Sequence, residues 1–220
     1  MNKESRIMIK KFMFGPFQVN TYLLWDEITN ECAVIDPGCY IELEEKNLES
    51  FISSNNLKVK YLICTHCHID HIMGCAFIKQ KYNPVFLVPE HDLPLLHDAE
   101  TQASTFNLKL KTPPPHDTVI TEDLVLYLGN KKLNFIYTPG HTAGEYCIYL
   151  KDEAICITGD VLFKGGIGRT DLWGGNYDTL IDSITNKLFA LPNDVTIYPG
   201  HGENSKIGTE KNENPFLKLR

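Results

Sequence analysis

The densest group of chemically active side chains in this sequence is the segment Thr65-His66-Cys67-His68-Ile69-Asp70-His71, which holds three imidazoles and a carboxylate. Side chains two positions apart in an extended chain point to the same side, so His66 and His68 can converge on one ion. Asp70 and His71 then face a second point. Neutral imidazole binds borderline divalent metals well, and a carboxylate adds compensating charge. The segment therefore predicts a metal site.

The run Cys64-Thr65-His66-Cys67-His68 also fits the C-x-x-C-H signature of covalent haem attachment. That interpretation leaves His66, Asp70 and His71 without a role. It also requires export, whereas Met1–Lys11 alternates charged and apolar residues and has no apolar core of a signal peptide. We therefore favour the metal site and expect a cytoplasmic protein.

Further histidines and carboxylates follow the ends of predicted strands, at Asp36, His141, Asp160 and His201. In layered α/β proteins the loops that leave one edge of a sheet gather functional groups. We therefore expect these residues to lie beside the histidine segment. The other three histidines lie in polar or proline-rich segments and are expected to be exposed: His91, His97 and His116.

Strands alternate with helical patterns along the chain, which predicts an α/β architecture with a buried sheet. Apolar runs bounded by turn residues predict strands over 7–14, 21–25, 31–35, 59–64, 84–88, 124–128, 133–138, 145–150, 154–158 and 195–198. Apolar stripes predict helices over 41–55, 72–82 and 177–188, with a polar helix over 90–105. Because strands continue on both sides of Pro113–Pro115, we interpret the prolines as a rigid surface loop and residues 1–220 as a single domain.

Composition narrows the class of partner. The chain has 220 residues and a formal net charge of −7, which argues against nucleic acid because phosphate binding needs a basic face. No apolar run reaches the length of a membrane span, so we expect no membrane partner. The seven cysteines are odd in number, and without export we expect them to be reduced and mostly buried. Cys67, between two candidate ligands, is expected to be a thiol in the pocket wall.

With these motifs in place, the sequence resembles the metallo-β-lactamase superfamily, and within it the small glyoxalase II-like hydrolases. The superfamily resemblance rests on the 65–71 segment followed by His141, Asp160 and His201. The loop 168–172 and the tail Asn214-Pro215-Phe216 are similar to the glyoxalase II-like branch. The resemblance implies a four-layer αββα sandwich with a dinuclear metal site at one edge.

The resemblance also implies a role for each candidate residue. His66, His68 and His141 would bind one divalent ion, Asp70, His71 and His201 a second, and Asp160 would bridge them. The ions would be zinc, with iron or manganese as alternatives, and would share a hydroxide that attacks a carbonyl carbon. Asp70 would be catalytic by orienting the nucleophile or managing its proton. Asp36 would hold a ligand histidine in the required tautomer.

The expected substrate is a small acyl-thiol, such as the thioester S-lactoylglutathione. Full-length glyoxalase II grips glutathione with a C-terminal helical domain, which the 19 residues after His201 (220 − 201) cannot build. Arg169 is the first candidate for an alternative cationic anchor, because a planar guanidinium suits a carboxylate, and Lys164 is the second. The competing interpretation of Arg169 is a structural ion pair with Asp171.

Two other activities fit the same histidine framework. One is a persulfide dioxygenase that uses a single iron and carries a similar Gly-x-Gly-Arg-Thr-Asp loop. The other is a β-lactamase or a phosphodiesterase-type hydrolase. A non-enzymatic binding module is disfavoured because every position expected to bind metal carries a histidine or an aspartate.

Overall fold

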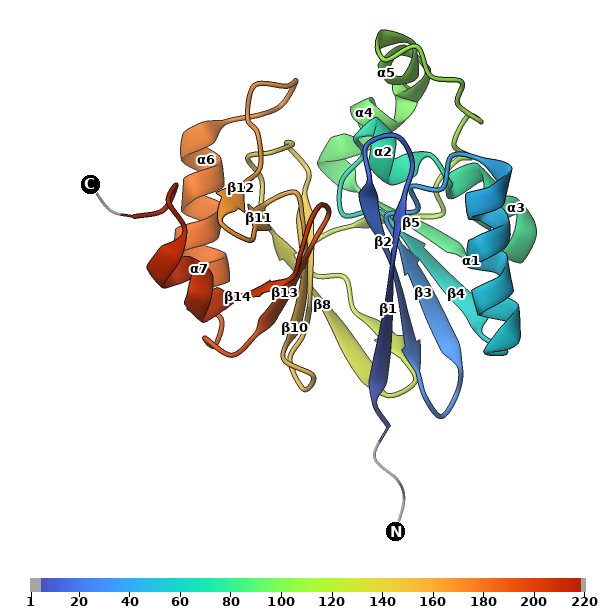
Figure 1. Cartoon of the computed structure of the whole chain (residues 1–220), viewed down its shortest axis with the longest axis horizontal. Helices are drawn as coiled ribbons and strands as arrows, with labels where there is room; N and C mark the ends of the chain where they lie inside the picture. Colours follow the sequence, from blue (N-terminus) through green and yellow to red (C-terminus); the bar gives the residue numbers. More distant parts are fainter. Residues whose placement is uncertain (1–4, 219–220) are drawn as a thin grey trace.

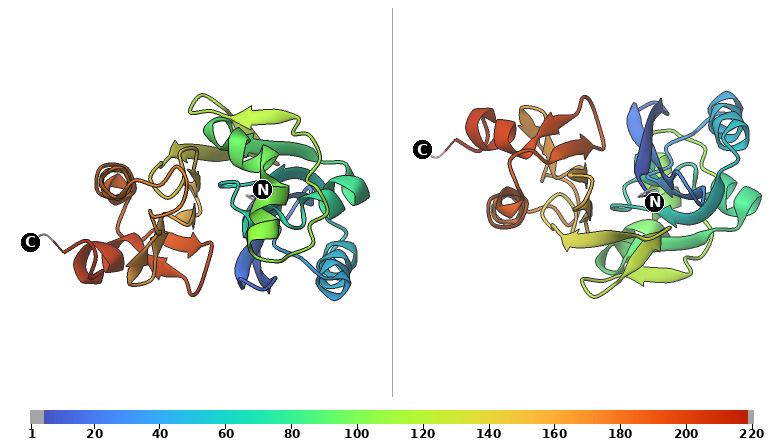
Figure 2. Two further views of the ribbon diagram at one scale, coloured as in Figure 1. Left: turned by 90° about the horizontal axis from the view of Figure 1, so that it is seen from above. Right: turned by 90° about the horizontal axis from the view of Figure 1, so that it is seen from below.

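The computed structural model describes residues 5–218 as four layers, in which two β-sheets pack face to face and helices cover their outer faces. We predicted no signal peptide over Met1–Lys11, and the first four residues of that segment lie outside the described range. Figures 1 and 2 show α1 and α3 outside one sheet and α6 and α7 outside the other. The predicted αββα sandwich is therefore confirmed.

The first sheet has the strand order β1-β2-β3-β4-β5-β6. The pairs β1–β2 and β2–β3 are antiparallel, and the pairs from β3 to β6 are parallel. The parallel strands need crossover connections, which the helices provide. The strands are β1 (Ile7–Phe14), β2 (Val19–Asp26), β3 (Glu31–Ile35), β4 (Lys58–Ile63), β5 (Val85–Pro89) and β6 (Thr118–Ile120).

The second sheet has the order β14-β13-β10-β9-β8-β7, and only its β10–β13 pair is parallel. Its strands are β7 (Leu126–Leu128), β8 (Lys131–Tyr137), β9 (Tyr146–Leu150), β10 (Ile155–Gly159), β13 (Thr196–Pro199) and β14 (Ser205–Lys206). A separate hairpin joins β11 (Leu162–Phe163) to β12 (Gly166–Ile167).

The helices are short apart from the first. They are α1 (Glu42–Ser54), α2 (Ile69–Ile72), α3 (Cys75–Tyr82), α4 (Leu93–His97), α5 (Ala99–Thr105), α6 (Tyr177–Asp182) and α7 (Ile207–Glu213). Three further helical turns are η1 (Glu90–Asp92), η2 (Ser183–Lys187) and η3 (Leu188–Ala190). None of the helices within 5–218 is both long enough and apolar enough to cross a bilayer.

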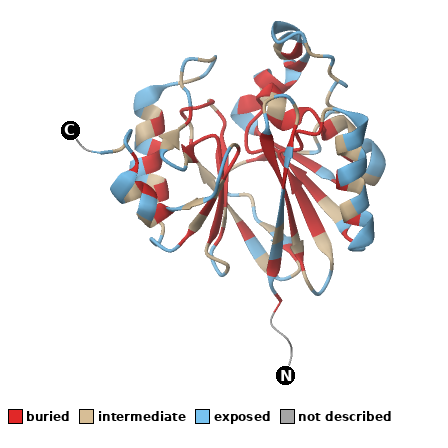
Figure 3. Ribbon diagram, in the orientation of Figure 1, coloured by how far each residue is buried: buried red, intermediate tan, exposed pale blue. Residues whose placement is uncertain are grey.

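Alternate residues of the central strands enter different cores, because successive side chains point to opposite faces of a sheet. In β4, Tyr61 and Ile63 pack between the two sheets, whereas Leu62 packs under the helices. In β10, Ile157 faces the first sheet and Cys156 faces the layer of α6 and α7. Burial on both faces explains why these strands are almost continuously apolar (Figure 3).

Three predicted helices are wrong in their bounds; the one over 177–188 is divided into α6, η2 and the start of η3. The helix over 72–82 is two helices, α2 and α3, separated at Met73-Gly74. The N–H of Gly74 donates to the carbonyl of Pro37 at 2.7 Å, and a Cβ there would lie 2.4 Å from Cys39 Sγ. This close approach excludes any larger residue. Because α2 begins at Ile69, Asp70 and His71 lie within this helix instead of before a helix.

The predicted polar helix over 90–105 is divided into η1, α4 and α5. It is not polar on its inner face, where Leu95, Leu96, Ala99 and Ala103 are buried in the core under the first sheet. The short elements β6, β14 and α7 were not predicted. The strands 7–14 and 31–35 are confirmed with the same bounds, and residues 113–115 lie in a loop as expected.

Candidate metal centre

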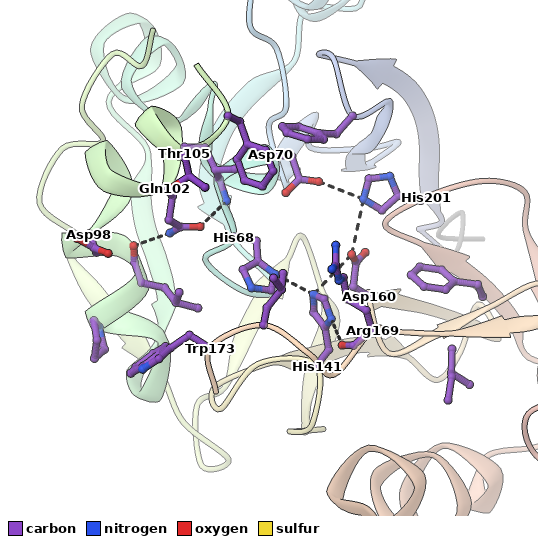
Figure 4. A pocket seen from close by; sticks show the side chains of 18 residues that line it. His68, Asp70, Asp98, Gln102, Thr105, His141, Asp160, Arg169, Trp173 and His201 are labelled. Atoms are coloured by element: carbon purple, nitrogen blue, oxygen red, sulfur yellow. Dashed lines mark hydrogen bonds and ion pairs between the residues drawn. The ribbon is translucent and has the colours of Figure 1, made fainter. Parts of the chain in front are cut away.

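The loop after β4 and the loop after β8 bring three histidines together. His66, His68 and His141 each offer a ring nitrogen, and these atoms lie within 4.8 Å of one another. His68 Nδ1 lies 2.8 Å from His141 Nε2. All three side chains are buried, so their arrangement is fixed by packing. Figure 4 shows His68 and His141 pointing toward each other.

A second group of three lies beside the first. Asp70 and His71 come from α2, and His201 follows β13; their ligand atoms also lie within 4.8 Å of one another. His201 Nε2 is 3.1 Å from Asp70 Oδ2. Asp160, directly after β10, lies between the groups: its Oδ2 is 3.6 Å from both His141 Nε2 and His201 Nε2. The seven candidate ligands thus form one cluster with Asp160 in the middle.

Several buried polar atoms of this cluster lack a hydrogen-bond partner. They include His66 Nε2, His71 Nε2 and Asp160 Oδ1. A buried polar atom without a partner costs free energy, so such atoms are rare unless a ligand satisfies them. Imidazole nitrogen and carboxylate oxygen are a typical donor set for divalent metals. The residues present therefore fit a metal centre.

The surroundings keep two of the imidazoles neutral. Burial lowers the pKa of His66 well below its usual value, and the neighbouring imidazoles act in the same direction. Burial, assisted by His141, lowers the pKa of His68 to about 3. Burial opposes ionisation of Asp160, but the nearby His71 outweighs it and the pKa of this carboxyl falls well below its usual range. These neutral rings and the ionised carboxylate are the forms that bind metals. The pKa of His71 moves the other way: burial lowers it, but the carboxylates of Asp70, Asp160 and Asp36 outweigh burial and raise it well above its usual value, so metal binding there would release a proton.

Contacts between the sheets place His201. The Val19–His201 bridge joins the start of β2 to the loop after β13. Asn20 Nδ2 and Tyr22 Oη donate to the carbonyl of Pro199 at 2.9 and 2.7 Å. Gly200 fits under the cluster only because it has no side chain: a Cβ there would lie 2.2 Å from Asp160 Oδ1.

The family model described as the metallo-beta-lactamase superfamily matches residues 14–201, which contain the whole cluster. The chain belongs to the metallo-beta-lactamase superfamily. Its fold is one that binds divalent metals, and the histidine–aspartate cluster lies at the edge of the sandwich.

The members of the superfamily that resemble this chain in sequence or structure do not share one functional description. The hydroxyacylglutathione hydrolase GloC of Haemophilus influenzae is 38% identical over 206 residues, which cover 93% of this chain and 95% of GloC. The crystal structure of BLEG-1 B3 metallo-beta-lactamase has a TM-score of 0.89 at 31% identity, covering 96% of this chain and all of that one. TTHA1623, solved in a di-iron-bound form, has a TM-score of 0.84 at 30% identity, covering 94% and 100%.

Asp36 lies where the sequence analysis expected a partner for a ligand histidine. Its Oδ2 is 3.1 Å from His71 Nδ1, and its two oxygens accept hydrogen bonds from the N–H and hydroxyl of Thr65. Its φ of 50° lies in the left-handed region, which is uncommon for a residue other than glycine. That strained backbone is tolerated where the surrounding contacts determine the conformation.

Sequence reasoning missed Glu145, which is completely buried directly behind the cluster. Glu145 Oε1 accepts a hydrogen bond from the N–H of Asp160 at 2.6 Å and lies 3.3 Å from His66 Nδ1. Burial raises the pKa of Glu145 well above its usual value, and Asp160 raises it further. The available signal was a lone carboxylate at the start of an apolar strand, four residues after His141.

Asp92 in η1 was also missed, although it connects two ligand loops. Its Oδ2 accepts from the N–H of Cys67 at 3.1 Å and from the hydroxyl of Thr142 at 2.8 Å. Its Oδ1 accepts from the N–H of Gly144 at 2.7 Å. A single buried carboxylate thereby holds the 65–68 loop against the 141–144 loop.

A cavity of about 900 Å³ opens beside the cluster. Arg169 lines it, and its guanidinium makes two 2.7 Å contacts with the carboxylate of exposed Asp171, the ion pair named as the competing interpretation. The backbone carbonyl of Arg169 also contacts His141 Nδ1 at 2.8 Å. Lys164 is not part of the cavity lining and pairs with Glu203 instead. The structure therefore gives no support to Lys164 as a substrate contact.

The expectation for Cys67 was wrong. It is fully buried in the core under the first sheet and does not line the cavity, and of the two histidines that flank it only His68 does. Cys64 is buried in the same core, with its Sγ 3.6 Å from Cys75 Sγ. Neither thiol of the C-x-x-C-H run is placed to bond a haem. All seven cysteines are free and buried, as predicted.

The other three histidines lie outside the cluster. His91 and His97 are exposed as expected, but His116 is half-buried beside Asp117.

Proposed function

We propose that this protein is a metal-dependent thioester hydrolase that cleaves an acyl-thiol such as S-lactoylglutathione. The observation that carries this proposal is the pairing of two three-residue groups around Asp160, beside an open cavity. A single ion with an open position would use about three protein ligands, and seven ligand-type side chains converge here. The likeness to GloC over nearly the full chain supports the thioester class.

His66, His68 and His141 would hold one ion, Asp70, His71 and His201 the other, and Asp160 both. When bound, such ions supply a water of lowered pKa and polarise a carbonyl oxygen. Asp70, with one oxygen facing His201, would orient that water and receive its proton. The carbon–sulfur bond breaks as the new carbon–oxygen bond forms, giving a carboxylic acid and a thiol. A thiolate is a good leaving group and needs little acid assistance.

Contacts on the side of the rings that faces away from the cluster orient two of the candidate ligands. His141 is held by the backbone carbonyl of Arg169 and His71 by Asp36, so each ring presents its other nitrogen to the cluster. Such contacts fix the tautomer and orientation of metal-binding histidines.

The test is an assay of protein loaded with zinc, iron or manganese. We expect thiol release from S-lactoylglutathione, measured with a thiol reagent, and two metal ions per chain by elemental analysis. Fully active protein with one ion per chain would contradict the dinuclear centre. The Asp160→Asn variant should lose metal and activity together, because a bridging anion becomes a neutral amide.

A second candidate function is an iron-dependent persulfide dioxygenase, favoured by the loop Gly166-Ile167-Gly168-Arg169-Thr170-Asp171. Oxygen uptake on glutathione persulfide by iron-loaded protein, with no thiol release from S-lactoylglutathione, would replace the first proposal by this one. Benzylpenicillin belongs in the same assay because of the likeness to BLEG-1.

A further inference from the structure

One side of the cavity is formed by helices α2, α4 and α5 and the residues after α4 and α5. We name this surface the helical wall; it consists of Ile69, Pro94, Leu95, Asp98, Gln102, Thr105 and Phe106. Phe17, from the turn between β1 and β2, extends it and packs edge-on against Phe106 with ring centroids 5.1 Å apart. The helical wall begins beside His68 and Asp70, the residues that flank Ile69.

Two of the three polar side chains of the helical wall, Gln102 and Thr105, use their polar groups within the protein. Gln102 Nε2 donates to the carbonyls of Cys67 and Leu95 at 3.1 and 2.8 Å, and its Oε1 accepts from the N–H of Ile69 at 3.0 Å. The hydroxyl of Thr105 donates to the carbonyl of Thr101 at 3.0 Å. The third, Asp98, is exposed and can only accept hydrogen bonds when ionised. Away from Asp98, a substrate that contacts this surface therefore meets hydrocarbon, and it finds no spare hydrogen-bond donor.

The rest of the cavity lining also contains apolar side chains, at Phe163, Ile167, Leu172 and Trp173, but it differs from the helical wall in its charge. In Figure 4, Gln102 and Thr105 lie on one side of His68, while Asp160 and Arg169 lie on the other. Among the described residues that line the cavity, Arg169 is the only lysine or arginine. An anionic group of a ligand would therefore bind on the Arg169 side. The helical wall suits a neutral, apolar group.

We propose, on the basis of the thioester hydrolase function above, that the acyl group of the substrate is an unsubstituted alkyl or aryl group that packs against the helical wall. The thiol carrier then lies on the Arg169 side, with the scissile carbonyl at the cluster between them. Because polar groups lose hydrogen bonds when they are buried on such a surface, short hydroxylated acyl groups gain less from it. The substrate class is acyl-thiols with apolar chains longer than lactoyl.

The experiment compares glutathione thioesters that differ only in their acyl chain. We expect kcat/KM to rise from S-acetyl through S-butyryl to S-hexanoylglutathione, by up to about fourfold for each methylene that becomes buried. Each rate is divided by that of alkaline hydrolysis to remove differences in intrinsic reactivity. A series that is flat or falls with chain length in active enzyme would overturn the proposal.

Two matched variants connect the effect to the helical wall. Phe106 and Phe216 are exposed to a similar degree, 48% and 56%, but only Phe106 lines the cavity. We expect Phe106→Ala to lower kcat/KM for the hexanoyl ester several-fold more than for the acetyl ester, with unchanged metal content. Phe216→Ala should leave the ratio between the two esters as in the wild type. Equal effects of both variants would contradict the assignment of the acyl group to this surface.

Thioethers cannot be hydrolysed, so their binding tests recognition of the apolar group independently of the proposed thioester hydrolysis. S-hexylglutathione should bind at least about tenfold more tightly than S-methylglutathione by calorimetry, given about fourfold per buried methylene. If S-hexylglutathione binds no more tightly, recognition of an apolar group fails. If it binds more tightly while no thioester is cleaved, the hydrolase function fails and the apolar binding surface stands.

Discussion

At the scale of single residues, each of three cluster imidazoles contacts a different partner through the nitrogen that faces away from the cluster. His66 faces the carboxylate of Glu145, His71 that of Asp36, and His141 a backbone carbonyl. Carboxylate partners raise the basicity of a ligand histidine more than a carbonyl does. Glu145 also accepts from the N–H of Asp160, so one side chain contacts two candidate ligands.

We therefore expect Glu145→Gln to weaken metal binding by roughly ten- to a hundredfold, measured by competition with a chelator. The amide oxygen can still accept from the N–H of Asp160, so the melting temperature of the metal-free protein should not fall. The matched control is Glu210→Gln, which changes another buried glutamate that contacts Ser205 and Asn214 instead of the cluster. A residue with only a structural role would give the opposite pattern, a lower melting temperature with unchanged metal affinity.

A second prediction at this scale concerns Arg169. If it holds the anionic thiol carrier, Arg169→Ala should lower kcat/KM for S-lactoylglutathione by up to about fivefold, since exposed ion pairs contribute roughly 0.2–1 kcal/mol. A small uncharged thioester should be affected much less, and metal content should not change. Asp171→Asn should instead lower the KM for S-lactoylglutathione, because it frees the guanidinium of Arg169 from its present partner. Equal losses on both substrates would make Arg169 a structural residue.

At the scale of elements, the cluster depends on loops that side chains hold together. Asp92 in η1 accepts one hydrogen bond from the 65–68 loop and two from the 141–144 loop. Burial raises the pKa of Asp92, although its three donors oppose the shift. Burial of the Asp92 carboxylate costs free energy, and its hydrogen bonds offset this cost while they fix the position of the 65–68 loop relative to the 141–144 loop.

Asp92→Ala should lower the free energy of unfolding by about 3 kcal/mol or more, because three buried donors lose their acceptor. For a chain of this size that corresponds to a decrease in melting temperature of roughly 6–12 °C. Thermal unfolding of the metal-free protein measures this effect directly. Asp98→Ala, an exposed aspartate six residues later, is the control and should change the melting temperature by no more than a degree or two.

At the scale of the whole molecule, the cluster joins the two sheets. His66, His68, Asp70 and His71 follow β4 of the first sheet, whereas His141, Asp160 and His201 follow strands of the second. The core between the sheets, which includes Tyr22, Ile35, Ile148 and Ile157, is buried independently of any ion. Metal should thus stabilise the sandwich without being needed to form it.

Removal of metal by a chelator should therefore lower the melting temperature and leave the far-ultraviolet dichroism nearly unchanged. A ligand at a hundred times its dissociation constant adds about 2.7 kcal/mol to the native state, or roughly 5–10 °C for a chain of this length. Restoring the ion should restore the melting temperature. Metal-free protein that is unfolded at room temperature would contradict the independent core.

The patterns in the sequence determined an α/β architecture with a buried sheet and the candidate ligands, and the resemblance to the superfamily implied the αββα sandwich. The strands are visible because burial on both faces makes them nearly continuous apolar runs, and His141, Asp160 and His201 are visible because each directly follows one. That these seven residues bind metal stays a prediction, as does the single domain over 1–220. What sequence patterns report is local periodicity and residue type, and both are strong here.

Only the tertiary structure decided which side chains support that cluster and what the cavity presents to a substrate. Glu145 and Asp92 contact residues 79 and 50 positions away from them, at His66 and Thr142, and no local pattern encodes such pairings. Gln102 looks polar in the sequence, yet its amide is saturated by backbone groups, so the surface it lines is apolar. For Arg169 the sequence left open a substrate contact or an ion pair with Asp171, and the structure shows the ion pair. Whether a polar group is available depends on its neighbours in space, and the chain order does not contain them.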